Sequence, residues 1–491
     1  MRSLFILLMA ACLLVACGSS DNPGEPQANP GSNQANDVGS NADDNDADED
    51  LDQLLSELRQ RLEQRGIEPL EPVQISNQQQ VELGHQLFFD PVLSGTKDVS
   101  CATCHPMEGA TSDVQPLSAG PLATTDEYGD RMTGPALSFT PRTSPDLFNR
   151  GHPDFTTHFW DRRLEELDDG RFAVYDRSLS KVTADYLRVF DDEFDTLLGA
   201  QAMFPVTSRD EMRGISGDDD VFGEPNDLAS FPDHDLEGIW RRLTDRILDS
   251  EEYRQLFAEA YPELNVDDIT FVQVARALGS FMSDAFGVAD SPWDQFLDGD
   301  DEALSDAQLR GADLFYGDAQ CADCHSGALL TDQQAYNWGV PPMTRGPEPL
   351  DNMDLGVAHR SHFGRDAQFN FRTPPLRNVE LTGPYMHNGV YSTLEAVIHH
   401  KTDPVAGLWN YNIAQLNPGF QSQLHTGVAE LQRVEDAMDL DALPTPSLSD
   451  REVADLVAFM ESLTSPDARD LTHLQLESVP SGLEVPEREI P

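Results

Sequence analysis

The chain combines ample length with a strongly acidic composition. It has 491 residues, of which 39% are hydrophobic, so it can form two or more domains with sizeable cores. Lys and Arg number 32 against 87 Asp and Glu, which gives a formal net charge of −55. Nucleic acid is excluded as a partner, because phosphate binding needs clustered basic side chains. The acidity fits either a surface adapted to high salt or an acidic exported protein.

The N-terminus predicts export and a lipid anchor. Arg2 gives a basic start, and the apolar run from Leu4 to Val15 is too short to span a bilayer but fits a signal-peptide core. The run ends in LVAC at Cys17, which resembles a bacterial lipobox. We expect residues 1–17 to be a lipoprotein signal peptide and the periplasmic protein to be held by lipid on Cys17, not by a membrane span. An ordinary signal peptide cut nearby is the alternative.

Composition and periodicity divide the rest of the chain. Residues 18–50 contain almost no large apolar side chain, which predicts a disordered acidic tether. Leucines between 51 and 62 fall on one helical face and predict a leading helix, with a connector to 72. We expect an N-terminal domain at 73–298, a C-terminal domain at 299–470 and a tail at 471–491.

A weak internal sequence repeat relates these two domains. The segment 84–89 (GHQLFF) has a counterpart at 311–316 (GADLFY), and each follows a cap-like serine, Ser76 or Ser305. Residues 142–149 likewise echo residues 372–378. Apolar spacing predicts helices within 236–260 and 266–284, whereas strand signals are sparse. Two related, mostly helical units explain this pattern better than chance.

Two Cys-x-x-Cys-His motifs give the strongest chemical signal. They are Cys101, Cys104 and His105, and Cys321, Cys324 and His325. In such a motif two thiols on one turn add across the vinyl groups of a haem, and the His is placed as the proximal iron ligand. The remaining cysteines are Cys12 in the signal core and Cys17 at the lipid site, so none is left for a disulfide. Two covalently bound haem c groups are expected, with zinc binding or a thioredoxin-like redox pair as the weaker alternatives.

An ordered set of sequence blocks resembles the bacterial di-haem cytochrome c peroxidases and the related MauG-type enzymes. The blocks lie between 75 and 464, at 84–90, 159–163, 201, 211–212, 331–332, 376–378, 381–389 and 393–395. The resemblance implies a mainly α fold with few strands, in which two cytochrome c-like haem domains pack around an interdomain interface. It also implies that electrons enter at the C-terminal haem and that peroxide reacts at the N-terminal one.

The same resemblance implies roles for three side chains around the first haem. Glu211 matches the family's catalytic glutamate, and Gln201 matches its neighbour in the pocket. Peroxide reduction needs an acid/base that moves a proton between the two peroxide oxygens, which a glutamate can do. Trp160 matches a tryptophan between the haems, where an oxidisable indole can relay electrons. A solvated glutamate and a core tryptophan are the plain alternatives.

A calcium ion at the domain interface is a further implication. Thr382 and Pro384 match residues that help hold this ion through backbone oxygens, a ligand type that suits calcium. Thr143 stands where the family usually offers an asparagine. This departure weakens the match at one of the ligand positions.

Two other departures concern the irons. No His lies between His105 and His152, and the loop that carries a plugging His in many family members reads Ser118-Ala119-Gly120-Pro121 here. The first iron is therefore expected to stay open, as in MauG-type enzymes. In the family, the distal ligand of the second haem is Met or Tyr. Counted from the block at 393–395, this position falls on Lys401 here, or on His400 if the alignment is shifted by one residue. A lysine amine binds iron only when it is deprotonated, which requires a desolvated site.

These features lead to one main functional expectation and two alternatives. The main expectation is a peroxidase that reduces hydrogen peroxide to water with electrons from a small periplasmic cytochrome c or copper protein. A MauG-like enzyme that oxidises a partner protein is the first alternative, and a non-enzymatic di-haem electron carrier is the second. The resemblance is also compatible with a homodimer.

Overall fold

The computed structural model describes residues 43–133, 138–175, 187–190, 193–343, 353–359 and 367–486. The expected signal peptide, Cys17 and tether residues up to 42 lie outside this range. Contacts divide the chain into Met1–Glu49 and Asp50–Pro491, and the described part of the first unit is only the start of helix α1. Among the described residues, no helix is long and apolar enough to cross a membrane.

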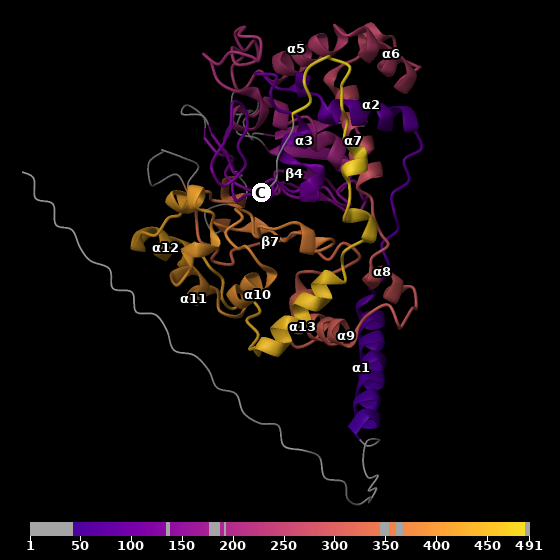
Figure 1. The fold of residues 1–491 in the computed structure, drawn as a ribbon, viewed down its shortest axis with the longest axis vertical. Coiled ribbons are helices and arrows are strands. Elements are labelled where there is room, and N and C mark those ends of the chain that lie inside the picture. The colour runs from indigo at the N-terminus through magenta and orange to yellow at the C-terminus, as the bar shows by residue number, and fades with distance from the viewer. Residues whose placement is uncertain are drawn as a thin grey trace, which may run out of the picture. The chain divides into compact units, whose positions relative to one another are not determined.

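The described chain is mainly helical, as the sequence predicts (Figure 1). The α-helices are α1 (Asp43–Arg65), α2 (Gln78–Phe89), α3 (Cys101–Cys104), α4 (Leu197–Gln201), α5 (Leu236–Leu248), α6 (Glu251–Ala260), α7 (Phe271–Ala285), α8 (Pro292–Leu297), α9 (Asp306–Tyr316), α10 (Leu394–Thr402), α11 (Pro404–Trp409), α12 (Val428–Glu435) and α13 (Asp450–Glu461). The region 236–260 holds two helices, because Ser250 caps the start of α6. Helix α1 begins at Asp43, inside the range expected to be tether, and its acidic first turn favours a helix N-terminus.

The strands are short and few. They are β1 (Thr124–Thr125), β2 (Arg131–Met132), β3 (Thr157–His158), β4 (Leu164–Glu166), β5 (Phe172–Tyr175), β6 (Leu187–Phe190), β7 (Ala335–Tyr336) and β8 (Phe371–Arg372). Strands β3 to β6 form an antiparallel sheet in chain order, and β1–β2 and β7–β8 are antiparallel pairs. In β3 and β4, His158 pairs with Leu164, which fixes the direction of the residues before Trp160.

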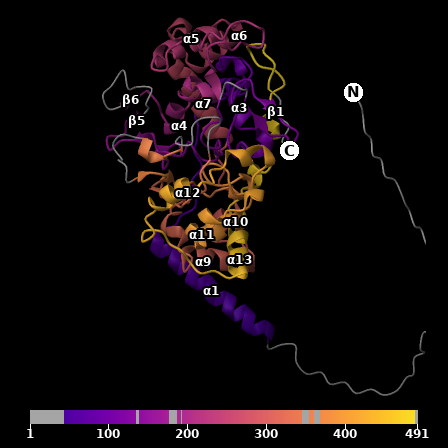
Figure 2. The ribbon, with the colours of Figure 1, turned by 90° about the vertical axis from the view of Figure 1, so that its left-hand side faces the viewer.

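Buried apolar side chains form two large clusters, one for each half of the chain. The first cluster contains residues of α2 and of α4 to α7, and the second contains residues of α8 to α10 and α13. Figure 2 shows α5, α6 and α7 at one end of the body and α9, α10 and α13 at the other. A smaller cluster, with Leu117, Phe139 and Val390 among its buried members, joins the two halves. Helix α8, inside the range expected for the first domain, contributes Trp293 and Phe296 to the second cluster.

The two halves share the same glycine-dependent helix contact. A Cβ at Gly84 in α2 would lie 2.0 Å from the carbonyl oxygen of Ala277 in α7. A Cβ at Gly311 in α9 would lie 1.9 Å from the carbonyl oxygen of Asp455 in α13. Only glycine allows the helices to approach this closely. The sequence repeat at 84–89 and 311–316 therefore corresponds to the same type of helix crossing in both halves of the chain.

The C-terminal segment returns from the second half to the first. After α13, Leu471 and Val479 are buried in the first apolar cluster. The Ser481 hydroxyl donates a hydrogen bond of 2.7 Å to the buried carboxylate of Asp90, which follows α2. In Figure 1 this segment is the yellow chain that runs from α13 towards α6. The described part of the expected tail, residues 471–486, thus packs on the N-terminal core.

We predict that Gly84→Ala lowers the free energy of unfolding by roughly 1–3 kcal/mol, since the added methyl group meets backbone that cannot rotate away. Denaturant unfolding of the haem-loaded protein would measure the loss. Gly199→Ala in α4 is the matched control, because its nearest contact would be an ordinary 3.4 Å. Equal stability of the Gly84 variant and the wild type would contradict the close crossing.

Candidate functional site

The first Cys-x-x-Cys-His motif forms a short helix that ends in a well-oriented imidazole. Cys101 to Cys104 make up α3, and His105 caps its end. The Nδ1–H of His105 donates to the carbonyl of Thr111 at 2.8 Å, which leaves Nε2 as the ligand atom. Burial lowers the pKa of His105, so its ring is neutral and able to bind a metal. Both cysteines are free, as thioether formation requires.

The second motif repeats this arrangement. Cys321 opens a single 3-10 turn (Cys321–Asp323), and the Nδ1–H of His325 donates to the carbonyl of Leu330 at 3.1 Å. Burial and the nearby Lys401 lower the pKa of His325 to about 4. Each motif thus presents a neutral imidazole whose Nδ1–H is held by a backbone carbonyl, which is the arrangement of a proximal haem ligand.

A cavity of about 500 Å³ gathers the residues predicted for the first site. Its lining includes all six of them, from separate parts of the N-terminal half: Cys101, Cys104, His105, Trp160, Gln201 and Glu211. Asp354 and Arg372 line it from the C-terminal half. The cavity therefore lies where the two halves of the chain meet.

Glu211 reaches this cavity from a π-helical turn, Arg209–Arg213. Such turns are rare and often mark functional positions, because they redirect one side chain. The backbone N–H of Gly95 donates to the carbonyl of Met212 at 2.8 Å. A Cβ at Gly120 would lie 2.2 Å from the carbonyl oxygen of Asp210, so the loop at 118–121 packs directly against the turn. This packing leaves a small residue as the only choice at 120.

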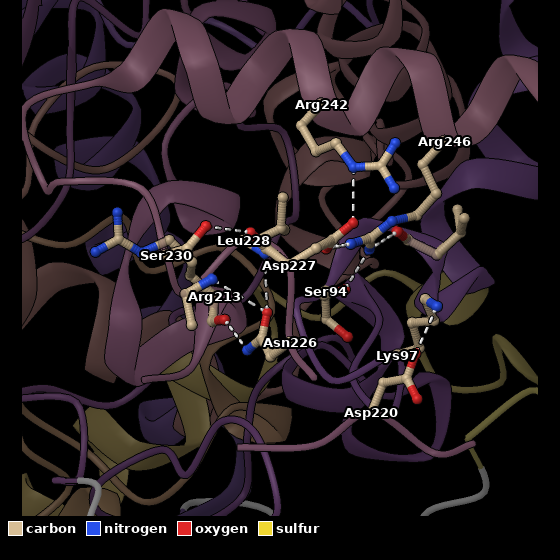
Figure 3. Close-up of polar contacts among 12 residues, drawn as sticks. Ser94, Lys97, Arg213, Asp220, Asn226, Asp227, Leu228, Ser230, Arg242 and Arg246 are labelled. Atoms are coloured by element: carbon tan, nitrogen blue, oxygen red, sulfur yellow. Dashed lines mark hydrogen bonds and ion pairs between the residues drawn. The ribbon is translucent and has the colours of Figure 1, made fainter. Parts of the chain in front are cut away.

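A polar network behind the turn holds it in place (Figure 3). The side-chain amide of Asn226 donates to the carbonyl of Arg213 at 2.8 Å. The buried guanidinium of Arg246 donates to the carbonyl of Ser94 at 2.7 Å and pairs with Asp227. These bonds join the Glu211 turn, helix α5 and the loop that leads into the first motif.

Trp160 lies between the cavity and the segment next to the second motif. Its indole N–H donates to the carbonyl of Thr143 at 3.1 Å, and its own carbonyl accepts the N–H of Arg372 at 2.8 Å. The next residue, Thr373, accepts a 2.7 Å hydrogen bond from the hydroxyl of Thr331, shortly after His325. A short path of covalent and hydrogen bonds thus runs from Trp160 to the second motif.

His158 is a cavity residue that sequence reasoning missed. It is 3% exposed, and its Nδ1–H donates to the side-chain oxygen of Gln201. Burial lowers the pKa of His158 to about 3, and the guanidinium groups of Arg372 and Arg150 act in the same direction. The ring is therefore neutral and holds the Gln201 amide in one orientation. The only sequence signal was its position two residues before Trp160.

Arg372 is a second cavity residue that sequence reasoning missed. Its buried charge shows whether the residues of the cavity suit a haem. Its guanidinium is 3% exposed and donates to the backbone carbonyls of Phe159 and Thr373. Burial and the nearby Arg150 lower the pKa of Arg372 to about 9. Asp146 acts in the opposite direction, but it pairs with Arg150, and no carboxylate forms an ion pair with Arg372 within the described ranges. A buried cation needs a counter-ion. A haem propionate would supply the missing charge, so the residues present fit the cofactor.

The two candidates for the distal ligand, His400 and Lys401, have different surroundings. Both ring nitrogens of His400 are engaged: Nδ1 accepts from the Tyr391 hydroxyl and Nε2–H donates to the carbonyl of Trp338, each at 2.8 Å. The amine of Lys401 lies 3.6 Å from the centre of the Trp338 ring. Burial holds the pKa of Lys401 well below its usual range, which favours the neutral amine.

The residues matched to the calcium site do not form a recognisable set of calcium ligands. The hydroxyl of Thr143 donates to the carbonyl of Gln115 at 3.1 Å, and its carbonyl already accepts from Trp160. Thr382 and Pro384 lie on either side of Gly383, and the peptide bond between Gly383 and Pro384 is cis. Across the described ranges, no cluster of three or more His, Cys, Asp or Glu could hold a metal. Calcium remains a prediction.

Two haem-attachment motifs in helical domains, with a cavity at one of them, define a di-haem protein of the cytochrome c type. Residues 78–302 match the family model described as di-haem cytochrome c peroxidase. This segment belongs to that family, and the chain is an oxidoreductase of the cytochrome-c peroxidase type with named relatives among both the peroxidases and the MauG proteins.

The chain is similar in sequence both to cytochrome c peroxidases and to MauG proteins. The chain is 27% identical over 354 residues to cytochrome-c peroxidase IdrP2 of Denitromonas iodatirespirans, covering 68% of this chain and 76% of the relative. It is 28% identical to cytochrome c551 peroxidase of Pseudomonas aeruginosa (65% and 71% covered) and 26% identical to MauG of Methylophilus methylotrophus (80% and 85% covered).

Solved structures share the fold. A MauG-like protein associated with microbial copper homeostasis superposes with a TM-score of 0.52 at 25% identity, covering 81% of this chain and 94% of that one. The diheme peroxidase BthA of Burkholderia thailandensis gives a TM-score of 0.51 at 19% identity, with 81% and 88% covered. The expected fold class is therefore confirmed.

We predict that His158→Phe lowers kcat/KM for peroxide about tenfold with unchanged haem content, because Gln201 loses the donor that orients it. Steady-state peroxidase assays would measure the change. The double variant with Gln201→Ala should lose no more than Gln201→Ala alone, since His158 acts through Gln201. His152→Asn, outside the cavity lining, is the control, and additive losses in the double variant would contradict this role.

Proposed function

We propose that this protein reduces hydrogen peroxide to water at the His105 site. The observation that carries the proposal is the single cavity that brings the first attachment motif together with Glu211, Gln201 and Trp160. When bound, the haem supplies an iron that coordinates peroxide and exchanges electrons with it. Cys101, Cys104 and His105 would hold this haem, and Arg372 would balance its propionate charge.

The side chains of the cavity supply proton transfer and orientation. Glu211 accepts a proton from one peroxide oxygen and delivers it to the other, which leaves as water. Gln201, fixed by His158, donates a hydrogen bond that orients the bound peroxide. Glu211 and Gln201 are half-buried, so these interactions are stronger than they would be in bulk water.

Electrons would enter at the second motif and reach the cavity through Trp160. The path over Arg372 and Thr373 supports this role, because it is short and lies at the domain contact. A small cytochrome c or copper protein in the periplasm is the proposed donor. The lipid on Cys17 would keep the enzyme at the membrane.

A MauG-like activity, oxidation of a partner protein, is the second candidate. The loop at 118–121 favours it, because this loop has no His and packs against the Glu211 turn instead of supplying an iron ligand. Brisk turnover with a reduced small cytochrome would favour the peroxidase. Slow turnover with a long-lived oxidised state would favour the alternative.

We also propose that Lys401 is the distal ligand at the second haem. Its amine is desolvated and lies beside the second motif, and it has no carboxylate partner among the described residues. His400 is a poor candidate, because binding iron would break a hydrogen bond that its ring already makes. A neutral amine beside an aromatic ring is a suitable iron ligand.

Glu211→Gln should lower kcat for peroxide by about 10²–10⁴-fold, because the amide cannot move a proton. Stopped-flow oxidation of a reduced small cytochrome would measure it, with haem absorption confirming an intact fold. Glu224→Gln is the control, since Glu224 is exposed and lies outside the cavity lining. A fully active Glu211 variant would refute the acid/base role.

Lys401→Met should change the spin-resonance and near-infrared signals of the second haem, because the iron gains a thioether or loses its sixth ligand. His400→Gln should leave the coordination signals unchanged, since Gln can keep a hydrogen bond to Trp338. The opposite pattern, with altered signals only in the His400 variant, would assign the ligand to His400.

A further inference from the structure

A buried tyrosine–histidine pair lies beside the second attachment site and has no role in the peroxidase mechanism. Tyr391 is 3% exposed and His400 is 2% exposed. The Tyr391 hydroxyl donates to Nδ1 of His400 at 2.8 Å. The Nε2–H of His400 donates to the carbonyl of Trp338, also at 2.8 Å. This second bond fixes the tautomer, so Nδ1 carries the free lone pair that faces the phenol.

The pair is adjacent to the proposed haem ligand. His400 precedes Lys401 in α10, and the ring of Trp338 contacts the Lys401 amine at 3.6 Å. Trp338 therefore touches the proposed ligand through its ring and the histidine through its carbonyl. The rings of Tyr391 and His400 are themselves 5.1 Å apart. Contacts of this length permit rapid electron exchange between the haem site and Tyr391.

Aromatic contacts continue outward from the pair. The ring of Tyr391 meets that of Tyr411 edge to face, with centroids 5.5 Å apart. Tyr411 is half-buried, and the next residues, Asn412 and Ile413, are exposed. The line of rings thus leads from the second haem site to the protein surface.

The surroundings of Tyr391 leave one destination for its proton. The ring belongs to the apolar cluster that joins the two halves, where Leu117, Val390 and Phe420 are also buried. A phenol that loses an electron must also lose its proton, since the cation radical is very acidic. In this apolar setting Nδ1 of His400 is the base that the hydroxyl already contacts. A phenylalanine would fill the same volume, so the hydroxyl needs a chemical reason to be buried.

We propose that Tyr391 is a redox-active tyrosine that takes up an oxidising equivalent from the di-haem centre. This inference rests on the proposed function, because hydrogen peroxide is the oxidant. Tyr391 gives one electron to the centre that peroxide has oxidised, its O–H bond breaks, and the proton moves to Nδ1 of His400. An electron from an aromatic side chain of the partner protein, passed on through Tyr411, returns Tyr391 to the phenol as the proton comes back, and the oxidised partner side chain releases its own proton to solvent. The step suits the second candidate activity, since it carries oxidation away from the peroxide cavity.

The test uses the haem-loaded protein and hydrogen peroxide without an electron donor. One equivalent of peroxide is added, the sample is frozen within seconds, and spin-resonance and optical spectra are recorded. We expect a tyrosyl radical whose signal narrows when the tyrosines are ring-deuterated. The signal should disappear in Tyr391→Phe and persist in Tyr385→Phe, the control, whose hydroxyl contacts only a backbone carbonyl within the described residues.

A second variant separates the proton acceptor from packing. His400→Gln can keep hydrogen bonds to Tyr391 and Trp338, but the amide is not a base, so the radical yield should fall at least about tenfold. Intact haem absorption would confirm that both variants fold. A radical that survives in Tyr391→Phe overturns the inference, as does a haem response to peroxide with no tyrosyl radical. A wild-type haem that does not respond to peroxide overturns the proposed function as well.

Discussion

The close crossing of α2 over α7 fixes the position of the first haem site. Gly84 lets the two backbones meet, and the chain then runs from α2 through a short buried loop directly into α3 and its cysteines. The carboxylate of Asp90 at the end of α2 accepts hydrogen bonds from Val92 and Tyr253, which hold that loop. The same crossing at Gly311 places the second motif after α9. The location of both haems thus depends on two contacts that admit no side chain.

The domain interface makes the two sites unequal. Arg142 pairs with Asp161, beside Trp160, and with Asp354 from the other half of the chain. Gln333, two residues after Thr331, accepts the backbone N–H groups of Thr156 and Thr157, just before His158. The segment that supplies His158 and Trp160 is thus held from both halves. One site gains a cavity with proton-transfer groups, whereas the other gains a buried amine and a tyrosine–histidine pair.

Local sequence patterns could predict the motifs, the repeat and the helical class, because each depends on neighbouring residues. Glu211, Gln201 and Trp160 came from resemblance, and their common cavity is visible only in the folded chain. Sequence could not separate His400 from Lys401, since adjacent residues on a helix point about 100° apart and packing decides which one faces the haem. His158 and Arg372 were missed because a buried His or Arg has no local signature. Their roles depend on partners 43 residues away for His158 and 213 residues away for Arg372.

The returning C-terminal segment has a consequence for the order of folding. Leu471, Val479 and Ser481 complete the core around α2, and Ser481 lies 391 residues after Asp90, its hydrogen-bond partner. Contacts between residues so far apart form slowly, because a long loop must close before they stabilise the chain. The N-terminal core can therefore close only after the second half has folded and brought this segment back. A chain cut before Leu471 would lose order in its first domain before its second.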